Sequence, residues 1–237
     1  MTSLSILVIG ASGFVGRALL REAAALPDLT MIAGVRRPDA LEAAIESAHL
    51  CWIDVCDPKT VAAALDEVRP SVVINTAAYG VRAHEQDSAS AIAVNAAGPC
   101  HVVEAAAAAG VRRVLHLGSY FEYGPQDGVI SESQTPRPDS LYAATKAEGS
   151  LFAIERGQTL GVQTVVLRLF NLWGAHEPSH RLFPSIQRAA VTGCRLALTD
   201  GTQWKDFTFV DDAANWILRL AMIEDLGSEN LINIGSG

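Results

Sequence analysis

The sequence is poor in aromatic residues and in charge. Of its 237 residues, 6% are aromatic and 19% are charged, while 49% are hydrophobic. A chain that remains disordered carries more charge and fewer apolar residues, so this composition excludes disorder as the main state. Because aromatic residues are few, most of the apolar fraction is Ala, Val, Leu and Ile. That mixture is typical of helices packed on buried parallel strands.

Positive charge is also scarce. Lysine and arginine together number 18, against 26 aspartates and glutamates, which gives a formal net charge of −8. Such a surface repels a phosphate backbone, so we expect no nucleic-acid partner.

Segments that would direct the chain into or across a membrane are missing. The first residues, MTSLSILVIG, lack the basic region of a signal peptide. The Ala-rich stretch 89–111 contains Asn95, His101 and Glu104, and it is too polar to span a bilayer. We therefore expect a cytoplasmic protein with no membrane partner.

Metal-binding patterns are weak. The segment HEPSH at 176–180 matches the letters of the zinc-protease pattern HExxH, which needs a helix to place both histidines on one face. It follows Gly174 and contains Pro178, so we expect a loop and no metal. The cysteines have no close metal-type spacing and are expected to be reduced thiols. They are Cys51, Cys56, Cys100 and Cys194.

Short apolar runs alternate with longer, helix-like segments along most of the chain. The runs predicted as strands cover 4–9, 30–35, 50–53, 71–75, 111–117 and 162–169. The segments predicted as helices cover 13–25, 38–47, 58–68, 88–109 and 140–160. This alternation predicts an α/β fold with a doubly wound parallel (Rossmann) sheet.

The pattern changes after about Leu169, where segments become shorter and loop signals more frequent. We expect residues 1–169 to form a dinucleotide-binding Rossmann domain. Residues 170–237 are then a small C-terminal substrate-binding lobe, partly interleaved with the first domain. It would lie over the carboxyl edge of the sheet, where ligands of such folds bind.

A glycine-rich turn follows the first predicted strand. Its three glycines have the spacing GxxGxxG, and they allow a tight turn and a close approach to a pyrophosphate at the start of a helix. The alternative is a plain tight turn. The predicted cofactor-binding residues of this turn are Gly10, Ser12, Gly13, Phe14, Val15 and Gly16.

The second predicted strand ends without the carboxylate that holds the ribose of NAD. Arg36 and Arg37 stand there instead, and two guanidiniums can pair with a 2′-phosphate. This favours NADP(H), with NAD(H) still possible. After the third strand, Asp54 and Val55 are predicted cofactor-binding residues. The Asp54 carboxylate is the candidate partner of the adenine amino group; the alternative is that it caps a turn.

Tyr142 and Lys146 lie one helical turn apart in YAATK. A nearby ammonium favours the phenolate, which makes a tyrosine a better proton shuttle than it is alone. Ser119, at the end of the fifth predicted strand, is placed beside them, where its hydroxyl can orient a carbonyl. The alternative is a surface Tyr–Lys pair.

Several longer segments carry a family resemblance. They include GASGFVGR, VVINTAAYG, PRPDSLYAATKAEGS, VVLRLFNLWG and WKDFTFVDDAANWI, in that order along the chain. Together they resemble the extended short-chain dehydrogenase/reductases, in the NAD-dependent epimerase/dehydratase group that acts on nucleotide sugars. The resemblance implies an NAD(P)-dependent enzyme that forms a homodimer through its long helices.

The resemblance also implies roles for individual residues. The catalytic set is Ser119, Tyr142 and Lys146. The cofactor-binding set gains Asn75, Ala77, Ala78, Asn95, Tyr142, Lys146 and Phe170. The substrate-binding set is Ser119, Tyr120, Phe121, Asn171, Arg181 and Lys205. Lys205 stands where the family often has arginine, so the bidentate fork for a diphosphate is absent.

Three activities are weighed. A 4,6-dehydratase needs an acid and a base at the positions of Tyr120 and Phe121, so dehydration is not expected. Glu122 is no substitute, because in a strand-like stretch its side chain would point to the other face. A 4-ketoreductase using NADPH agrees with Arg36 and Arg37. The alternatives are an NAD-dependent 4-epimerase and a non-enzymatic NADP-binding regulator, although regulators of this kind commonly lack the Tyr–Lys pair.

Overall fold

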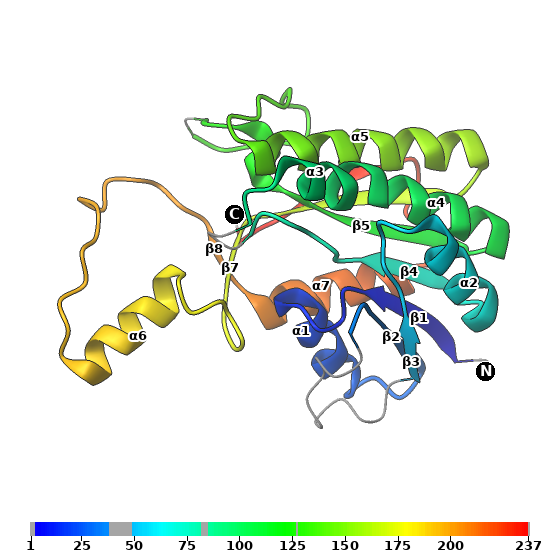
Figure 1. The fold of residues 1–237 in the computed structure, drawn as a ribbon, viewed down its shortest axis with the longest axis horizontal. Coiled ribbons are helices and arrows are strands. Elements are labelled where there is room, and N and C mark those ends of the chain that lie inside the picture. The colour runs from blue at the N-terminus through cyan, green and yellow to red at the C-terminus, as the bar shows by residue number, and fades with distance from the viewer. Residues whose placement is uncertain (1–2, 38–48, 82–84, 127, 237) are drawn as a thin grey trace.

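Seven parallel strands form the main sheet of the computed structural model, which describes residues 3–37, 49–81, 85–126 and 128–236 (Figure 1). Their spatial order is β3-β2-β1-β4-β5-β6-β9. The strands are β1 (Leu4–Ile9), β2 (Leu29–Val35), β3 (His49–Trp52), β4 (Val72–Asn75), β5 (Arg113–Ser119), β6 (Gln163–Leu169) and β9 (Leu231–Ile234). The predicted doubly wound parallel sheet is confirmed.

The chain reverses its direction of winding between β1 and β4. It runs outward from β1 to β2 and β3, then returns to place β4 on the other side of β1. In the register, Ile9 faces both Gly34 and Asn75, so these three strands end level with one another. A reversal of this kind opens a crevice at the carboxyl ends of the strands, where ligands of such folds bind.

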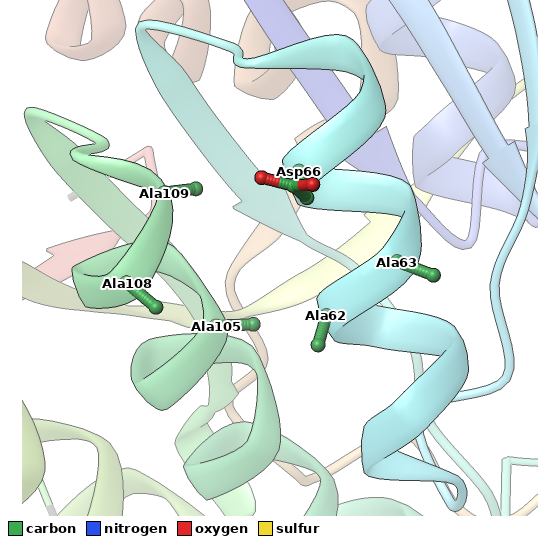
Figure 2. Close-up of a pocket in the computed structure, with 6 residues that line it drawn as sticks. All are labelled: Ala62, Ala63, Asp66, Ala105, Ala108 and Ala109. Atoms are coloured by element: carbon green, nitrogen blue, oxygen red, sulfur yellow. The ribbon is translucent and has the colours of Figure 1, made fainter.

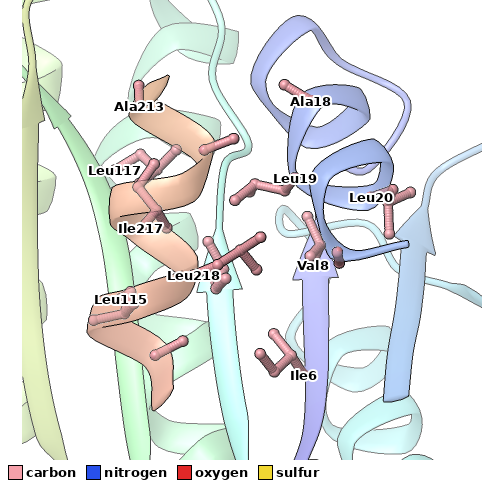
Figure 3. Packing of buried hydrophobic residues seen from close by; sticks show 14 of the residues in the cluster. Ile6, Val8, Ala18, Leu19, Leu20, Leu115, Leu117, Ala213, Ile217 and Leu218 are labelled. Carbon is pink, nitrogen blue, oxygen red and sulfur yellow. The ribbon is translucent and has the colours of Figure 1, made fainter. Parts of the chain in front are cut away.

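Helices cover both faces of this sheet (Figure 1). On one face, α1 (Phe14–Ala23) and α7 (Val210–Met222) pack side by side on the central strands (Figure 3). On the other face lie α2 (Pro58–Val68), α4 (Gly98–Ala109) and α5 (Leu141–Leu160). Each fully buried Leu or Ile contributes about 1.5–3 kcal/mol of apolar burial, so the two clusters hold the layers together.

Local signals explain where the helices begin and end. The Asp57 side chain accepts a 2.9 Å hydrogen bond from the Lys59 amide, and Pro58 occupies the first turn of α2. At the start of α5, the Ser140 hydroxyl accepts from the Ala143 amide at 3.2 Å. The helix ends at Gly161, whose φ of +71° places it in the left-handed region.

The helix predicted over 88–109 is interrupted. It consists of α3 (Ser88–Ala91), a π-helical segment η3 (Ile92–Ala97) and α4. Pro99 has no N–H to offer the Asn95 carbonyl four residues earlier, which explains the loss of α-helical bonding there. The helix predicted over 38–47 lies outside the described residues.

The segment after Leu169 contributes to both sheets. Strands β7 (Asn171–Trp173) and β8 (Phe207–Phe209) form a small parallel sheet. Helix α6 (Leu182–Thr192), which has no buried residue along its described length, stands away from the main sheet (Figure 1). Helix α7 and strand β9 return to the main sheet, so the lobe interleaves with the first domain, and its division at residue 169 stays a prediction.

One helical run among the described residues, Ser88–Ala109, is long and apolar enough to cross a membrane by length and composition. Half of it is buried inside the protein, against α2 and α5. It is therefore a core helix. The cytoplasmic location stays a prediction.

Candidate active site

The predicted site residues gather at one edge of the main sheet because they follow the carboxyl ends of its strands. Gly10 follows β1, Asn75 ends β4, Ser119 ends β5 and Phe170 follows β6. Tyr142 and Lys146 come from the first turns of α5, which begins at the same edge. The topology alone therefore brings together residues that are more than 150 positions apart in the sequence.

The glycine turn between β1 and α1 is closely packed. Gly10 has a φ of +81°, and a Cβ on it would lie 2.6 Å from Thr76 Oγ1. A Cβ on Gly16 would lie 2.5 Å from the Gly10 carbonyl oxygen. Thr76 was not predicted as a site residue. It fixes the turn by donating to the carbonyls of Ile9 at 2.8 Å and Gly10 at 3.1 Å. Helix α1 therefore begins with its free N–H groups at the crevice.

Candidate residues for the adenosine half lie on the outer strands. Arg36 and Arg37 follow β2 with exposed side chains, and the Arg36 carbonyl accepts from Trp52 Nε1 at 3.1 Å. Asp54 Oδ1 accepts from the Cys56 amide at 3.0 Å, so one carboxylate oxygen stabilises a turn. Val55 is buried beside it. Their cofactor contacts stay predictions.

Ser119, Tyr142 and Lys146 form one connected group. The Ser119 hydroxyl lies close enough to the Tyr142 phenol to lower its pKa. Lys146 is 1% exposed, and its Nζ donates a 2.5 Å hydrogen bond to the Leu117 carbonyl near the end of β5. The Tyr142 and Lys146 side chains thus both point toward the end of β5. A carbonyl group bound there can contact the hydroxyls of Ser119 and Tyr142.

Burial shifts the pKa values of this group in opposite directions. Burial raises the pKa of Tyr142 to about 12, opposed by the Ser119 hydrogen bond and the charge of Arg181. Burial lowers the pKa of Lys146 to about 8, opposed by the charge of Glu122. The pKa of His116 lies well below 6.5 because of burial and the nearby Lys146. At neutral pH the tyrosine therefore holds its proton and the lysine is mostly charged.

Two buried asparagines support the walls of the site. Asn75 Oδ1 accepts from the Ala77 amide at 3.2 Å. Asn95, in η3, accepts from the Tyr79 amide at 2.8 Å and donates to the Tyr79 carbonyl and to Thr145 Oγ1. Asn95 thus ties the loop after β4 to the residue before Lys146. Its hydrogen-bonding capacity is largely used inside the protein, and its cofactor contact stays a prediction.

The loop after β4 closes over Tyr142. Ala77 is partly buried and Ala78 is exposed. Gly80, at a φ of +92°, lies so close that a Cβ there would be 3.2 Å from Tyr142 Cδ2. Gly80 was not predicted as a site residue, although the letters YG in VVINTAAYG were part of the resemblance.

Aromatic rings line one side of the group. Phe121 meets Tyr142 edge-on at 6.0 Å between centroids, and Tyr120 stacks on Phe170 at 5.3 Å. The Tyr120 hydroxyl donates to Asn171 Oδ1 at 2.9 Å, and Lys205 Nζ lies 5.9 Å from the Tyr120 ring. The structure thus brings these predicted substrate residues together.

The loop 174–180 carries the HEPSH letters without the helix they require. Glu177 Oε1 lies 3.6 Å from Arg181 Nε, and Arg181 is close enough for its charge to lower the pKa of Tyr142. Among the described residues, no group of three His, Cys, Asp or Glu side chains is placed to hold a metal ion.

The stretch after Ser119 is a 3-10 helix, η4 (Tyr120–Tyr123), and not strand-like as expected. The Ser119 side chain and the Glu122 side chain cap this turn reciprocally. As a result Glu122 is fully buried behind the triad, against Arg168 of β6. Neither residue was predicted to belong to the site, because their meeting depends on the turn and on the pairing of β5 with β6.

A hollow of about 380 Å³ lies elsewhere, between α2 and α4 (Figure 2). Asp66, Ala108 and Ala109 place it near the carboxyl ends of these helices, and therefore near the amino edge of the parallel sheet. It is lined by Ala62, Ala63, Asp66, Ala105, Ala108 and Ala109. With a single polar side chain and no connection to the triad, it is not the active site.

Comparison with known proteins gives consistent matches. Residues 6–235 match the NAD dependent epimerase/dehydratase family. The chain is 30% identical to a dTDP-6-deoxy-L-talose 4-dehydrogenase (NAD(P)(+)) of Kitasatospora kifunensis, over 97% of this chain and 73% of that protein. It is 28% identical to a UDP-glucose 4-epimerase of Mycolicibacterium smegmatis, over 98% of this chain and 77% of that protein.

Solved structures agree. The structure of MoeE5 in complex with UDP-glucuronic acid and NAD superposes with a TM-score of 0.84 at 31% identity, covering 98% of this chain and 77% of that one. The fold and the sequence pattern thus point to the same group of proteins.

Proposed function

Because this chain belongs to the NAD-dependent epimerase/dehydratase family, we propose that it reduces the 4-keto group of a nucleotide-linked 6-deoxy sugar, using NADPH. The observation that carries this proposal is the close approach of the Ser119 hydroxyl to the Tyr142 phenol, with Lys146 held one helical turn away. This group can protonate a carbonyl oxygen that is being reduced.

The residues at the crevice fit a dinucleotide. The absence of a Cβ at Gly10 and Gly16 leaves room for a close backbone approach, and α1 presents its N-terminus there. Arg36 and Arg37 would hold the 2′-phosphate of NADPH. When bound, the cofactor supplies the hydride.

The proton comes from Tyr142. As the carbonyl carbon gains a hydride, its oxygen becomes an alkoxide, which takes the phenolic proton and leaves an alcohol and a tyrosinate. Ser119 donates to the same oxygen and stabilises the developing charge. Lys146 stabilises the tyrosinate, which regains its proton from solvent. Because burial raises the pKa of Tyr142 to about 12, the tyrosine is present as the acid before the reaction.

The aromatic side chains and Lys205 fit the sugar ring and the diphosphate of such a substrate. Tyr120, Phe121 and Phe170 offer flat apolar faces for a deoxygenated sugar. The Lys205 ammonium, beside Tyr120, would pair with the diphosphate. The similarity to a dTDP-6-deoxy-L-talose 4-dehydrogenase supports a reaction at C4.

A second candidate is an NAD-dependent 4-epimerase. It is favoured by the likeness to a UDP-glucose 4-epimerase and to MoeE5, whose structure contains NAD. An epimerase retains its cofactor and shows no net oxidation of NADPH, which separates it from the reductase. A regulator without turnover is the third candidate.

We also propose a cytoplasmic homodimer formed through α4 and α5. These helices pack side by side, and α5 leaves Leu151 and Phe152 56% and 43% exposed. A sedimentation mass of one chain at micromolar concentration would refute the dimer.

The reaction is tested with purified protein and a panel of dTDP- and UDP-linked 4-keto-6-deoxyhexoses. We expect NADPH oxidation equal to the amount of reduced sugar formed. Release of NAD on denaturation, with interconversion of the 4-epimers when a 4-hydroxy nucleotide sugar is supplied in place of the ketone and with no NADPH consumption, would favour the epimerase. Tight NADPH binding without turnover would favour the regulator.

A further inference from the structure

A buried ion pair lies behind the triad. Glu122 has no exposed surface and Arg168 is 3% exposed, and Arg168 Nε donates to Glu122 Oε2 at 2.7 Å. The guanidinium also lies 4.3 Å from the centroid of the Tyr123 ring. Two well-packed apolar side chains could fill such a place at no loss of stability, because burying charges costs desolvation free energy. The pair therefore invites a functional explanation.

The other carboxylate oxygen faces the catalytic residues. Glu122 Oε1 accepts from the Ser119 amide at 2.8 Å and from the Ser150 hydroxyl at 3.0 Å. Ser150 lies one helical turn after Lys146 on α5. One carboxylate thus connects the backbone of Ser119 with the helix that carries Tyr142 and Lys146.

Gly118 makes room for this arrangement. It lies opposite Arg168 in the β5–β6 register. A Cβ at Gly118 would be 2.7 Å from Glu122 Oε1 and 3.1 Å from Arg168 Cγ. The backbone, the ion pair and the capped turn of η4 therefore fit together as one unit.

The charges around Lys146 leave Glu122 as its counterion. The pKa of His116 on β5 lies well below 6.5, and the pKa of Tyr142 on α5 is about 12, so both are neutral at pH 7. Arg168 on β6 is cationic. Within the described part of the chain, Glu122 is the group whose charge raises the pKa of Lys146 against the effect of burial.

We propose that Glu122, held by Arg168, is a positioning residue that fixes the Ser119 backbone against α5 and is the buried counterion of Lys146. Its consequence for catalysis rests on the proposed reductase function, in which the ammonium stabilises the tyrosinate. Glu122 has no exposed surface, so it acts through the residues that it contacts.

The charge of Lys146 is measurable without any substrate. Lys59 and Lys205 are the other two lysines in the sequence, so ¹³C-lysine NMR can follow Lys146 through a pH titration. In Glu122→Gln we expect the Lys146 pKa to fall by about one unit, the size of a charge interaction over several ångströms inside a protein. Ser150→Ala is the matched control: it removes a buried hydrogen bond to the same oxygen but keeps the charge, so the Lys146 pKa should not move.

A folded Glu122→Gln variant with an unchanged Lys146 pKa would overturn the proposal. If that variant does not fold, the double variant Glu122→Gln/Arg168→Met leaves neither charge unpaired. It must still show a fall in the Lys146 pKa, smaller than in the single variant because the Arg168 charge is lost as well. In an active enzyme, the alkaline limb of kcat should move to lower pH in Glu122→Gln and stay in place in Ser150→Ala. An inactive wild type would refute the reductase, whereas the NMR titration would still decide the role of Glu122.

Discussion

Lys146 reaches back from α5 to the Leu117 carbonyl, 2.5 Å away, and is buried there beside the end of β5. Its folded-state pKa of about 8 lies below the usual 10.5. Between these values the unfolded chain binds a proton that the folded chain has lost, so this residue makes stability rise with pH.

Lys146→Met removes that dependence. Relative to the variant, the wild type should become more stable as the pH rises from 8 to 10. We expect its free energy of unfolding to increase by roughly 1 kcal/mol more per pH unit. Chemical denaturation of both proteins at several pH values measures the difference, and other titrating groups cancel because both chains share them. Parallel stability curves would show that Lys146 is not desolvated as described.

Tyr142→Phe removes the proposed acid and keeps the ring. Turnover should fall by about 10²–10⁴-fold, the usual contribution of a positioned acid, while NADPH affinity, measured by nucleotide fluorescence, changes little. Tyr79→Phe is the matched control, because the Tyr79 hydroxyl accepts a 3.3 Å hydrogen bond from the Asp87 amide, outside the triad. Equal activity of wild type and Tyr142→Phe would contradict the mechanism.

Gly10→Ala tests the glycine turn. The new Cβ would lie 2.6 Å from Thr76 Oγ1, so the turn must open, and we expect loss of cofactor binding in a calorimetric titration. Gly110→Ala is the control: Gly110 has a similar φ of +72°, but a Cβ there meets nothing within 4 Å. Similar nucleotide affinity in both variants would show that close packing at Gly10 does not matter.

Arg36 and Arg37 are expected to select the phosphorylated cofactor. Replacing both with alanine should weaken NADPH binding by roughly 10–100-fold, as expected for losing charge-assisted hydrogen bonds worth about 1.5–3 kcal/mol, and should leave NADH binding unchanged. Arg69→Gln, on the exposed end of α2, is the control. If NADPH and NADH weaken equally, the arginines have no part in cofactor choice.

The elements that position the site were predictable because their signals are local. Apolar runs located six of the strands of the main sheet, and glycine spacing located the turn at Gly10. The Tyr142–Lys146 pair could be placed on one helix face from its spacing alone. The π-helical segment at Asn95 was not predicted. The helix pattern is otherwise continuous there, so the predicted helix extended through Pro99 without an interruption.

What was missed depends on contacts between distant elements. The pairing of Glu122 with Arg168 requires the β5–β6 register and a 3-10 turn that replaces the expected extended backbone. The return of β9 to the edge of the main sheet depends on the open side of β6. Neither arrangement has a signature in a short stretch of sequence.

Transfer of deuterium is the most direct test of the proposed reaction. The protein is supplied with NADPH carrying deuterium at the transferable position and a nucleotide-linked 4-keto-6-deoxy sugar, and the product is analysed by mass spectrometry and NMR. We predict one deuterium at C4 of the product for each NADPH oxidised. Full recovery of the 4-keto sugar with NADPH unconsumed, or NADPH oxidation with no deuterium at C4 of the product, would contradict the account.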